Sequence, residues 1–448
     1  MTDTVDTAVS PGYFRGRDIR SLAADLRSGR TTSVELVEHS LAAITRLDPI
    51  LNAFTTVDTE GALAAARTAD RERAEGRDRG VLHGIPVSVK DLIDIAGQVT
   101  TSGSLAHPRR AETDAECVSR LHAAGAVIVG KNVLHEFAYG ATGDRSAHGA
   151  SRNPWDVNRI SGGSSGGSAV ATAAGMVPLA VGTDTAGSVR VPAALCGVTG
   201  FKPAYGDIPT AGVHALAASL DHVGVFAATA GGVADAYAIM SGHTPDRSQV
   251  EPRVAWLDPA GFGPCDPAIA TTVRDAMDEA GIAVEATARL PFPAGEAFSV
   301  LSVLQACEAY AERMDDLSGN EQIIDAEVVE RLLRGRDTAA WQYVRADRRR
   351  DAFRSAIAGL FERFDVVAMP TVPTVATAIG QRAHEIGGQA VEVRSALLSL
   401  TCPWNLTGHP ALSVPAGTVS GLPVGLQLIT TRGAEQSLFD LAERIERR

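Results

Sequence analysis

The sequence predicts an α/β protein: a single domain built on one large central mixed β-sheet that helices cover on both faces. Short apolar runs of strand length alternate with helical patterns along the chain, as in proteins that layer helices on a sheet. Hydrophobic residues make up 45% of the 448 residues and charged residues 21%, the composition of a globular chain with a large core. No internal repeat or linker divides the sequence, so we expect one domain over residues 1–448.

A helical arm is expected over residues 1–50. Thr32 and Glu35 form the capping-box pattern that opens many helices, and the apolar residues after them recur at helical spacing. Pro49 marks the expected end of this helix.

Strands and helices then alternate toward the C-terminus. A β-rich run at residues 85–90 follows a Gly-Ile-Pro turn, so Lys90 should stand at the carboxyl end of a strand, where open α/β sheets place their chemistry. Further patterns predict a helix over 114–124 with a strand over 126–129, a helix over 168–175 with a strand over 178–181, a helix over 347–363 with a strand over 366–369, strands over 411–414 and 424–428, and a last helix from about 435.

Charge and cysteine content narrow the partners and the compartment. The formal net charge of −12 disfavours nucleic acid and anionic membranes, and no apolar stretch of about 18 residues suggests a membrane span. The N-terminus lacks a basic start followed by an apolar run, so no secretory signal is expected. Five cysteines, odd in number and without metal-type spacing, fit reduced thiols in the cytoplasm.

Lysine is rare in this chain. Of the 41 basic residues only Lys90, Lys131 and Lys202 are lysines. A buried lysine amine can lose its proton and act as a base, which a guanidinium cannot do. A drift toward arginine that left lysines by chance is an equally good explanation for Lys131 and Lys202.

A serine- and glycine-rich tract at residues 161–168 is the densest signal. A flexible linker has this composition, but this tract is embedded in the α/β pattern. A phosphate loop would end in Lys-Ser or Lys-Thr, and this one does not. Residues 163–167 satisfy the G-x-S-x-G pattern of a nucleophile elbow, yet no apolar strand precedes them, as that elbow requires. We therefore reject the elbow and a histidine-based triad with it.

Residues 182–188 have the pattern of a strand end, a tight turn and a helix start, with Ser188 at the helix N-terminus. The free backbone N–H groups of Thr185, Ala186 and Gly187, with that of Ser188, can converge there on a developing oxyanion. The alternative is that Ser188 is an ordinary N-cap serine. Local sequence leaves both interpretations open.

Three motifs in register resemble the amidase signature family. They are PVSVKD with Lys90, GGSSGGSAVATAAG with Ser164, and GTDTAGSVRVPAALCGVTGFKP with Ser188. The resemblance is strong over about 17–240 and looser over the C-terminal strands. It implies a signature core at about 60–240 and a catalytic Ser–cisSer–Lys set: Ser188 as nucleophile, Ser164 as bridging serine after a cis Gly163–Ser164 peptide, and Lys90 as base.

The chemistry implied is hydrolysis of a carboxylic amide C–N bond by an amidase. Neutral Lys90 would take a proton from Ser164, which takes one from Ser188 as it attacks the carbonyl. An acyl-enzyme forms, and water activated by the same base hydrolyses it. No metal or other cofactor is expected, because the histidines lack ligand spacing.

Other residues near these motifs have less specific patterns. Asp184 and Arg190 are expected to form an ion pair that frames the turn, and Ser165 to join the same hydrogen-bond network. Ala186 stands where the family usually has glycine, so its methyl group narrows the turn. Tyr139, Gly140 and Thr142 are candidates for a substrate wall, and hydrophobic packing explains them equally well.

Three other functions remain open. They are a ureide-type hydrolase acting on biuret-like or allophanate-like substrates, the glutaminase subunit of a tRNA-dependent amidotransferase, and a catalytically silent binding protein. Residues 295–345 are expected to form a variable, substrate-side region. There Arg331, Arg334 and Arg336 either attract a carboxylate or form a solvated helix face. The expected partners are a small-molecule amide and, as in many proteins of this family, a second copy in a homodimer.

Overall fold

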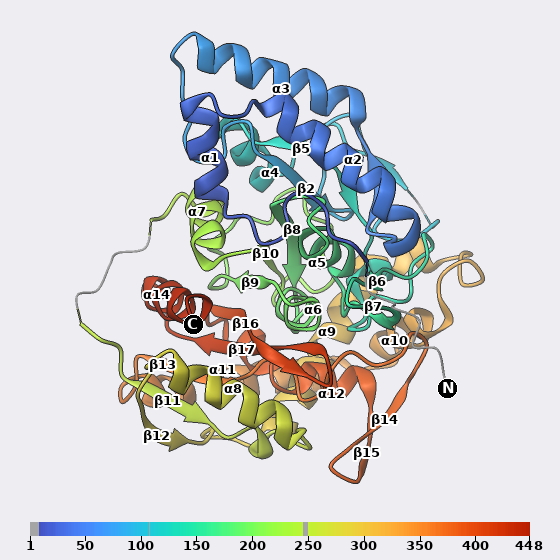
Figure 1. Ribbon diagram of the computed structural model, residues 1–448. Helices are drawn as coiled ribbons and strands as arrows, with labels where there is room; N and C mark the ends of the chain where they lie inside the picture. Colours follow the sequence, from blue (N-terminus) through green and yellow to red (C-terminus); the bar gives the residue numbers. More distant parts are fainter. Residues whose placement is uncertain (1–8, 107, 245–249) are drawn as a thin grey trace, which may run out of the picture.

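Eleven strands of the described residues form one mixed sheet, which confirms the predicted fold class (Figure 1). The computed structural model describes residues 9–106, 108–244 and 250–448. In spatial order the strands are β1 (Phe54–Val57), β5 (Val127–Asn132), β2 (Pro86–Lys90), β8 (Leu179–Asp184), β10 (His222–Ala227), β9 (Thr199–Lys202), β16 (Ala411–Val419), β17 (Leu422–Ile429), β13 (Val366–Pro370), β11 (Val254–Leu257) and β12 (Val284–Ala288). The pairs β5–β2, β2–β8, β13–β11 and β11–β12 are parallel, and the other pairs are antiparallel.

Helices cover both faces of the sheet, as alternation along β8 makes clear. Leu179 and Val181 pack into one core with α1, α4 and α7, whereas Ala180 packs into the opposite core with α2 and α5. Such alternation is what a strand buried on both faces requires. The helices are α1 (Ile19–Ser28), α2 (Ser33–Leu51), α3 (Thr59–Ala74), α4 (Glu116–Ala123), α5 (Gly166–Ala173), α6 (Arg190–Cys196), α7 (Ala230–Ser241), α8 (Pro267–Glu279), α9 (Ala294–Leu317), α10 (Ala326–Arg336), α11 (Ala340–Phe361), α12 (Val393–Ser399), α13 (Cys402–Thr407) and α14 (Glu435–Glu446).

Small elements complete the chain outside the main sheet. They are the hairpin-like pairs β3 (Val99–Thr100) with β4 (Arg109–Arg110), β6 (Arg152–Asn153) with β7 (Asp156–Ile160) and β14 (Ala383–Ile386) with β15 (Gln389–Glu392), and the 3₁₀ turns η1 (Glu136–Ala138) and η2 (Pro259–Gly261). Over the ranges that the structure describes, every helix is too short or too polar to span a bilayer.

The predicted capping box is present at the start of α2. The Thr32 hydroxyl accepts the Glu35 N–H at 3.1 Å, and the Glu35 carboxylate accepts the Thr32 N–H at 2.9 Å. The expected helix end at Pro49 is wrong by two residues. Pro49 lies within the last turn, and the helix stops where Asn52 adopts a left-handed conformation with φ +52°.

The Arg-rich helix α11 begins at Ala340, seven residues before the predicted start at 347. The Gln342 side chain accepts the Ala339 N–H at 2.9 Å and so satisfies one of the free donors at the helix start. The predicted strands at 411–414 and 424–428 are confirmed, but both are longer because they pair with each other as β16 and β17.

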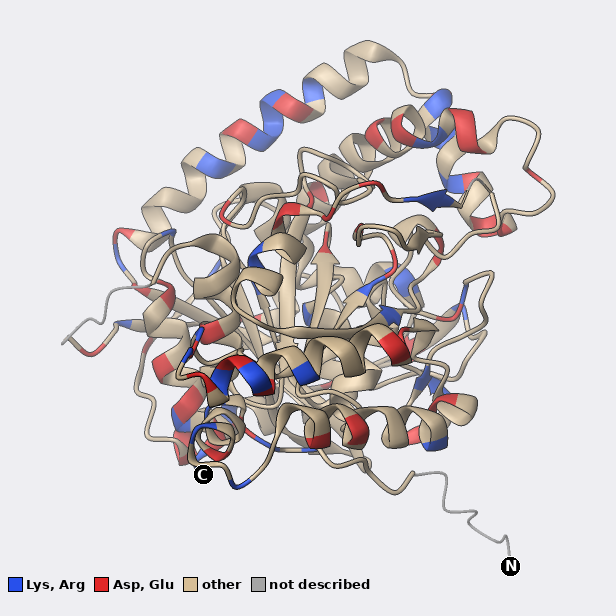
Figure 2. Ribbon diagram, turned by 90° about the horizontal axis from the view of Figure 1, so that it is seen from above, with Lys and Arg blue, Asp and Glu red and all other residues tan. Residues whose placement is uncertain are grey.

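Charged residues gather on the outer helices, and the central strands carry few of them (Figure 2). The parallel neighbours β2 and β8 lie near the middle of the sheet, with Val89 opposite Val181. Their carboxyl ends therefore lie at one edge, which brings Lys90 next to Thr183. Lys90 is a titratable side chain buried at this edge of the sheet. Buried titratable groups of this kind often belong to functional sites.

Candidate active site

Lys90 ends β2 and is fully buried, with 0% of its surface exposed. Its Nζ donates to Ser164 Oγ at 2.7 Å and to Thr183 Oγ1 at 2.8 Å. Burial lowers the pKa of this amine to about 7, although Asp221 and Asp184 act in the opposite direction. A large share of the Lys90 amine is therefore neutral near pH 7, with two hydroxyl groups as its partners.

Ser164 follows a cis peptide bond, so the predicted cis Gly163–Ser164 peptide is confirmed. Backbone hydrogen bonds hold this segment on both sides. The Gly163 N–H donates to the Ala141 carbonyl at 2.8 Å, and the Ser164 carbonyl accepts the His135 N–H at 3.0 Å. The Ser164 hydroxyl is thus fixed beside the Lys90 amine at the start of α5.

Ser165 joins the serine tract to β8 and to the segment of Ser188. Its Oγ donates to the Thr183 carbonyl at 3.0 Å and accepts the Thr183 N–H at 3.2 Å. Its backbone N–H donates to the Ser188 carbonyl at 3.3 Å. Ser165 thus bonds to Thr183 and Ser188 rather than to the Asp184–Arg190 pair itself, and the three segments carrying Lys90, Ser164 and Ser188 lie together.

Ser188 lies in the turn between β8 and α6. The expectation that it starts the helix is wrong: α6 begins at Arg190, and Val189 is its N-cap. The reason is Asp184, whose Oδ2 accepts the Val189 N–H at 3.1 Å and so ends the turn one residue later. Among the described residues, the N–H groups of Ala186, Gly187 and Ser188 donate to no acceptor.

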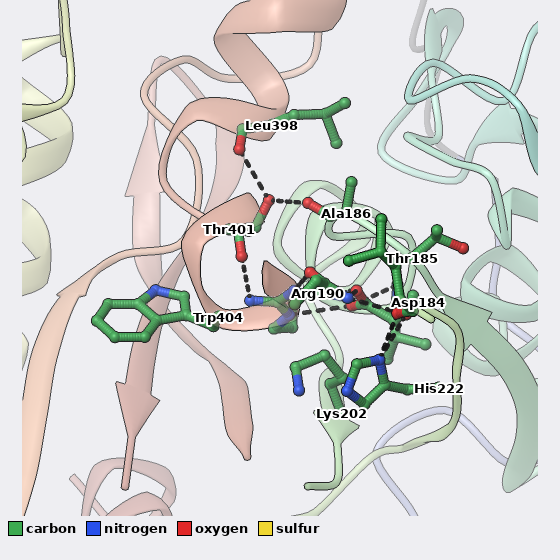
Figure 3. A network of polar contacts seen from close by, with 12 residues as sticks. Asp184, Thr185, Ala186, Arg190, Lys202, His222, Leu398, Thr401 and Trp404 are labelled. Atoms are coloured by element: carbon green, nitrogen blue, oxygen red, sulfur yellow. Dashed lines mark hydrogen bonds and ion pairs between the residues drawn. The ribbon is translucent and has the colours of Figure 1, made fainter. Parts of the chain in front are cut away.

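Gly187 is required by the shape of this turn. Its φ is +142°, and a Cβ at this position would lie 2.2 Å from Thr401 Oγ1. Thr401 approaches so closely because its hydroxyl donates to the Ala186 carbonyl at 2.7 Å (Figure 3). That bond turns the carbonyl of Ala186 toward Thr401 and leaves the N–H groups of the turn free.

Asp184 and Arg190 form the predicted ion pair, and both side chains are fully buried (Figure 3). Arg190 Nη2 lies 2.9 Å from Asp184 Oδ1, and Arg190 Nε donates to Asp184 Oδ2 at 3.0 Å. The remaining Arg190 donors reach the Thr401 carbonyl at 3.0 Å, Gln427 Oε1 at 2.7 Å and Asn405 Oδ1 at 2.5 Å. Arg190 outweighs the effect of burial and holds the pKa of Asp184 well below its usual range.

Asp221 is a buried carboxylate that the sequence analysis missed. It accepts the Thr185 hydroxyl at 2.5 Å and the N–H groups of Leu216 and Ala217 at 2.8 and 3.1 Å. Burial raises its pKa to about 6. The sequence signal was an isolated acidic residue directly before the apolar strand β10, and only the fold shows that this strand neighbours β8.

Tyr139, Gly140 and Thr142 lie on the loop beside the serine tract, and their expected role stays a prediction. Tyr139 is buried, and the Thr142 hydroxyl donates to Asp144 Oδ1 at 2.6 Å. Gly140 must lack a side chain, because a Cβ there would lie 2.1 Å from His135 Nε2. The Gly140 backbone is therefore held close to the segment that carries Ser164.

No His, Cys, Asp and Glu side chains within the described part of the chain are grouped in threes so as to hold a metal ion. The site offers instead one buried amine, two serine hydroxyls and a turn with free N–H groups. This set of groups can transfer protons and stabilise an oxyanion.

The mixed sheet, with a buried lysine at the end of β2 and Ser188 in the turn after β8, defines an α/β protein with a candidate active site at one edge of the sheet. A profile described as Amidase matches residues 35–439. The chain therefore belongs to the Amidase family and is an amidase.

Similar proteins include two curated relatives and a solved structure. The chain is 38% identical to AtzE of the 1-carboxybiuret hydrolase from Pseudomonas sp. (strain ADP), with 90% of this chain and 92% of the relative covered. It is 36% identical to a glutamyl-tRNA(Gln) amidotransferase subunit from Anaeromyxobacter dehalogenans (strain 2CP-C), with 96% and 95% covered. A crystal structure of an amidase superposes with a TM-score of 0.90 at 32% identity, covering 96% of this chain and 100% of that one.

Replacement of Arg190 by leucine should lower the free energy of unfolding by about 3–5 kcal/mol, because Asp184 would remain buried without its counter-ion. Urea unfolding followed by circular dichroism measures this loss. The surface change Arg334→Leu is the control and should cost less than about 1 kcal/mol. Equal stability of the two variants would contradict a structural role of the buried pair.

Replacement of Lys90 by methionine should change how stability depends on pH. The folded amine loses its proton at about pH 7, whereas the same amine in the unfolded chain keeps it to about pH 10. Between these values the unfolded chain binds more protons, so the stability of the wild type should rise relative to Lys90→Met as pH increases, by up to about 1.4 kcal/mol per pH unit.

Urea unfolding of both proteins between pH 6 and pH 10 tests this slope, with Arg334→Met as the control for an exposed cation. A stability difference between wild type and Lys90→Met that stays constant with pH would contradict the lowered pKa of Lys90.

Proposed function

We propose that the protein hydrolyses the C–N bond of a small amide or ureide through an acyl-enzyme on Ser188. The observation that carries the proposal is the 2.7 Å hydrogen bond between the buried Lys90 amine and Ser164 Oγ. Burial favours the neutral form of Lys90, and only this form has a lone pair that can take a proton. The neighbouring hydroxyl groups can supply that proton.

In the first half-reaction, Ser188 Oγ forms a bond to the substrate carbonyl carbon while its proton passes to Ser164, whose own proton passes to the Lys90 amine. The carbonyl π electrons move to the oxygen, and the tetrahedral intermediate forms. Its collapse breaks the C–N bond, and the proton returns from Lys90 through Ser164 to the leaving nitrogen. The products are an ester of Ser188 and ammonia or an amine.

In the second half-reaction, water takes the place of the leaving amine. Lys90 and Ser164 accept a proton from the water as its oxygen attacks the ester carbonyl. The intermediate collapses to a carboxylic acid and free Ser188, which regains a proton through the same relay. In this sequence of steps the three side chains carry every proton that moves between substrate, water and products.

The turn from Thr185 to Ser188 supplies the oxyanion hole of this mechanism. Support comes from the free N–H groups of Ala186, Gly187 and Ser188, and from the bond that turns the Ala186 carbonyl toward Thr401. Backbone donors fixed before the reaction need no reorganisation as charge develops on the oxygen. Thr185 takes part through its hydroxyl bond to Asp221, which anchors the turn.

The ureide alternative has specific support from the similarity to AtzE of a 1-carboxybiuret hydrolase. The chemistry at Ser188 is the same for an amide and a ureide, because both present a carbonyl carbon bonded to nitrogen. The role of glutaminase subunit in a tRNA-dependent amidotransferase is supported by the similarity to the glutamyl-tRNA(Gln) amidotransferase relative. It differs in requiring partner proteins for function.

The expected setting is a homodimer with a small amide substrate in the cytoplasm. All five cysteines are free thiols, which fits a reducing compartment. Residues 295–345 now correspond to α9, α10 and the start of α11, and we propose that this region lies on the substrate side within one domain. Size-exclusion chromatography with light scattering measures the oligomeric state directly.

Ser188→Ala should lose roughly 10,000-fold or more in kcat on the preferred substrate, since the attacking oxygen is removed. The assay is product release, detected by mass spectrometry, from a panel of primary amides, anilides, ureides and glutamine. Ser119→Ala, at an exposed serine of α4, is the matched control and should keep full activity. Activity of Ser188→Ala at the wild-type level would overturn the assignment of the nucleophile.

Activity should depend on a group with a pKa of about 7, because only neutral Lys90 can accept a proton. We expect kcat/KM to fall about tenfold per pH unit below pH 7 and to level off above it. Lys90→Arg should be inactive at every pH, since the guanidinium stays charged. A flat profile from pH 5 to pH 9 would exclude Lys90 as the base.

A further inference from the structure

Arg394 is a half-buried cation about two helical turns before Thr401, the residue that contacts the turn carrying Ser188. It is the second residue of α12, and this helix leads to Thr401, whose hydroxyl contacts the Ala186 carbonyl (Figure 3). Seven residues at 1.5 Å per residue place Arg394 about 10 Å along the chain from Thr401. A short helical segment therefore leads from this cation to the residue that contacts the turn of Ser188.

The guanidinium of Arg394 has few partners. Its Nη2 donates to Gln305 Oε1 at 3.3 Å, and its Cζ lies 5.9 Å from the centre of the Tyr139 ring. Its Nε is shielded from solvent and has no hydrogen-bond partner among the described residues. Glu392, an acidic neighbour, is engaged in capping α12, where its carboxylate accepts the Ser395 N–H at 3.2 Å. Arg394 therefore retains donors for a further acceptor.

Arg331 brings a second cation to the same place. Its Nη1 donates to the Tyr139 carbonyl at 2.7 Å, and only 12% of its side chain is exposed. Its carboxylate partner, Glu327 at 3.0 Å, is shared with Arg145 at 3.0 Å and Arg382 at 2.7 Å. Arg382 also pairs with Asp144 at 2.9 Å, and Arg145 lies 3.7 Å from Asp325, whereas Glu327 is the carboxylate that Arg331 contacts.

Burial, followed by the charge of Arg331, lowers the pKa of Arg394. Removing a charge from water is unfavourable unless a counter-charge compensates it. An anion bound between these guanidinium groups would supply that counter-charge, and the planar guanidinium fork fits the two oxygens of a carboxylate.

The other arginines of α10 differ from Arg331. Arg334 pairs with Glu330 and its side chain is 67% exposed, and Arg336 pairs with Asp337 on the surface. These two form the solvated helix face that the sequence allowed. Only Arg331 turns inward, toward the loop of Tyr139 and toward Arg394.

The loop of Tyr139 links this cation pair to the reacting groups. Tyr139 is followed by Gly140 and Ala141, and the Ala141 carbonyl accepts the Gly163 N–H next to Ser164. The same loop therefore contacts both guanidinium groups and the segment that carries Ser164.

We propose that Arg394, with Arg331 beside it, binds a carboxylate group of the substrate, so that the substrates are small amides or ureides that carry a carboxylate. The inference rests on the proposed hydrolysis at Ser188 and adds the substrate class to it. Arg394 is then a specificity-determining residue: it distinguishes an anionic substrate from a neutral one of the same length.

The experiment compares pairs of compounds that differ only in the carboxylate. The pairs are malonamate with propionamide, succinamate with butyramide, glutaramate with pentanamide, and ureidoacetate with ethylurea. In the wild type, kcat/KM for at least one anionic member should exceed that for its neutral twin by roughly 100-fold. In Arg394→Gln this ratio should fall to within about 3-fold, mainly through a higher KM.

Two further variants separate recognition from folding. Arg394→Lys should recover part of the preference, since a point charge remains without the planar fork. Arg334→Gln, at an exposed arginine, should leave the ratio unchanged. A purely structural role of Arg394 would lower the activity toward both members of a pair equally, and that result, or a wild-type ratio near one, would overturn the proposal.

A binding measurement covers the case in which no pair is hydrolysed. Malonate, succinate and glutarate would be titrated into wild type and Arg394→Gln by calorimetry, after thermal unfolding has shown that the variant is folded. The wild type should bind at least one of them, and the variant should bind it at least about tenfold more weakly. Absence of binding, or equal binding by both proteins, would refute the carboxylate site. Failure of the proposed function is recognised separately, by hydrolysis that persists in Ser188→Ala.

Discussion

Arg190 and Asp184 form an ion pair without solvent contact at the point where β8 turns into α6, and the remaining contacts of the site are arranged around it. Asp184 accepts the Val189 N–H, which sets where the helix begins and leaves Ser188 in the turn. Arg190 extends to Thr401, Asn405 and Gln427. A buried ion pair is stable only when its donors and acceptors are satisfied. The partners that satisfy Arg190 come from the C-terminal part of the chain, so the pair connects that part to the turn of Ser188.

The three lysines of the chain differ in the partners that their buried amines contact. All three are fully buried. Lys131 pairs with Asp91 at 2.7 Å, so a counter-charge stabilises its ammonium form. Lys202 donates to the carbonyls of Pro203 and His409, which accept hydrogen bonds but release no proton. Lys90 alone among them contacts hydroxyl groups on two sides, and hydroxyl groups can pass a proton onward. The rarity of lysine in the sequence drew attention to all three, and their partners in the fold distinguish them.

The parts of the fold and site that follow from sequence are those with local signals. The capping box at Thr32, the strand ending at Lys90 and the turn at Ser188 each depend on a few adjacent residues. What escaped prediction depends on contacts between distant segments. Asp221 reaches Thr185 only because β10 pairs with β8, and Arg394 lies over the Tyr139 ring only because α12 packs near that loop. The start of α6 was predicted too early because the Asp184 carboxylate accepts the Val189 N–H. This contact forms only in the folded turn and cannot be read from the local sequence.

The bond from Arg190 to Gln427 joins residues separated by 237 positions and lies near the C-terminal end of the chain. During synthesis the serines and Lys90 leave the ribosome long before Thr401, Asn405 and Gln427 exist. The turn of Ser188 therefore depends on contacts from a strand that is synthesised more than 200 residues later and pairs with β13 and β16. Substitutions in β17, far from Ser188 in the sequence, can therefore disturb the turn through Gln427.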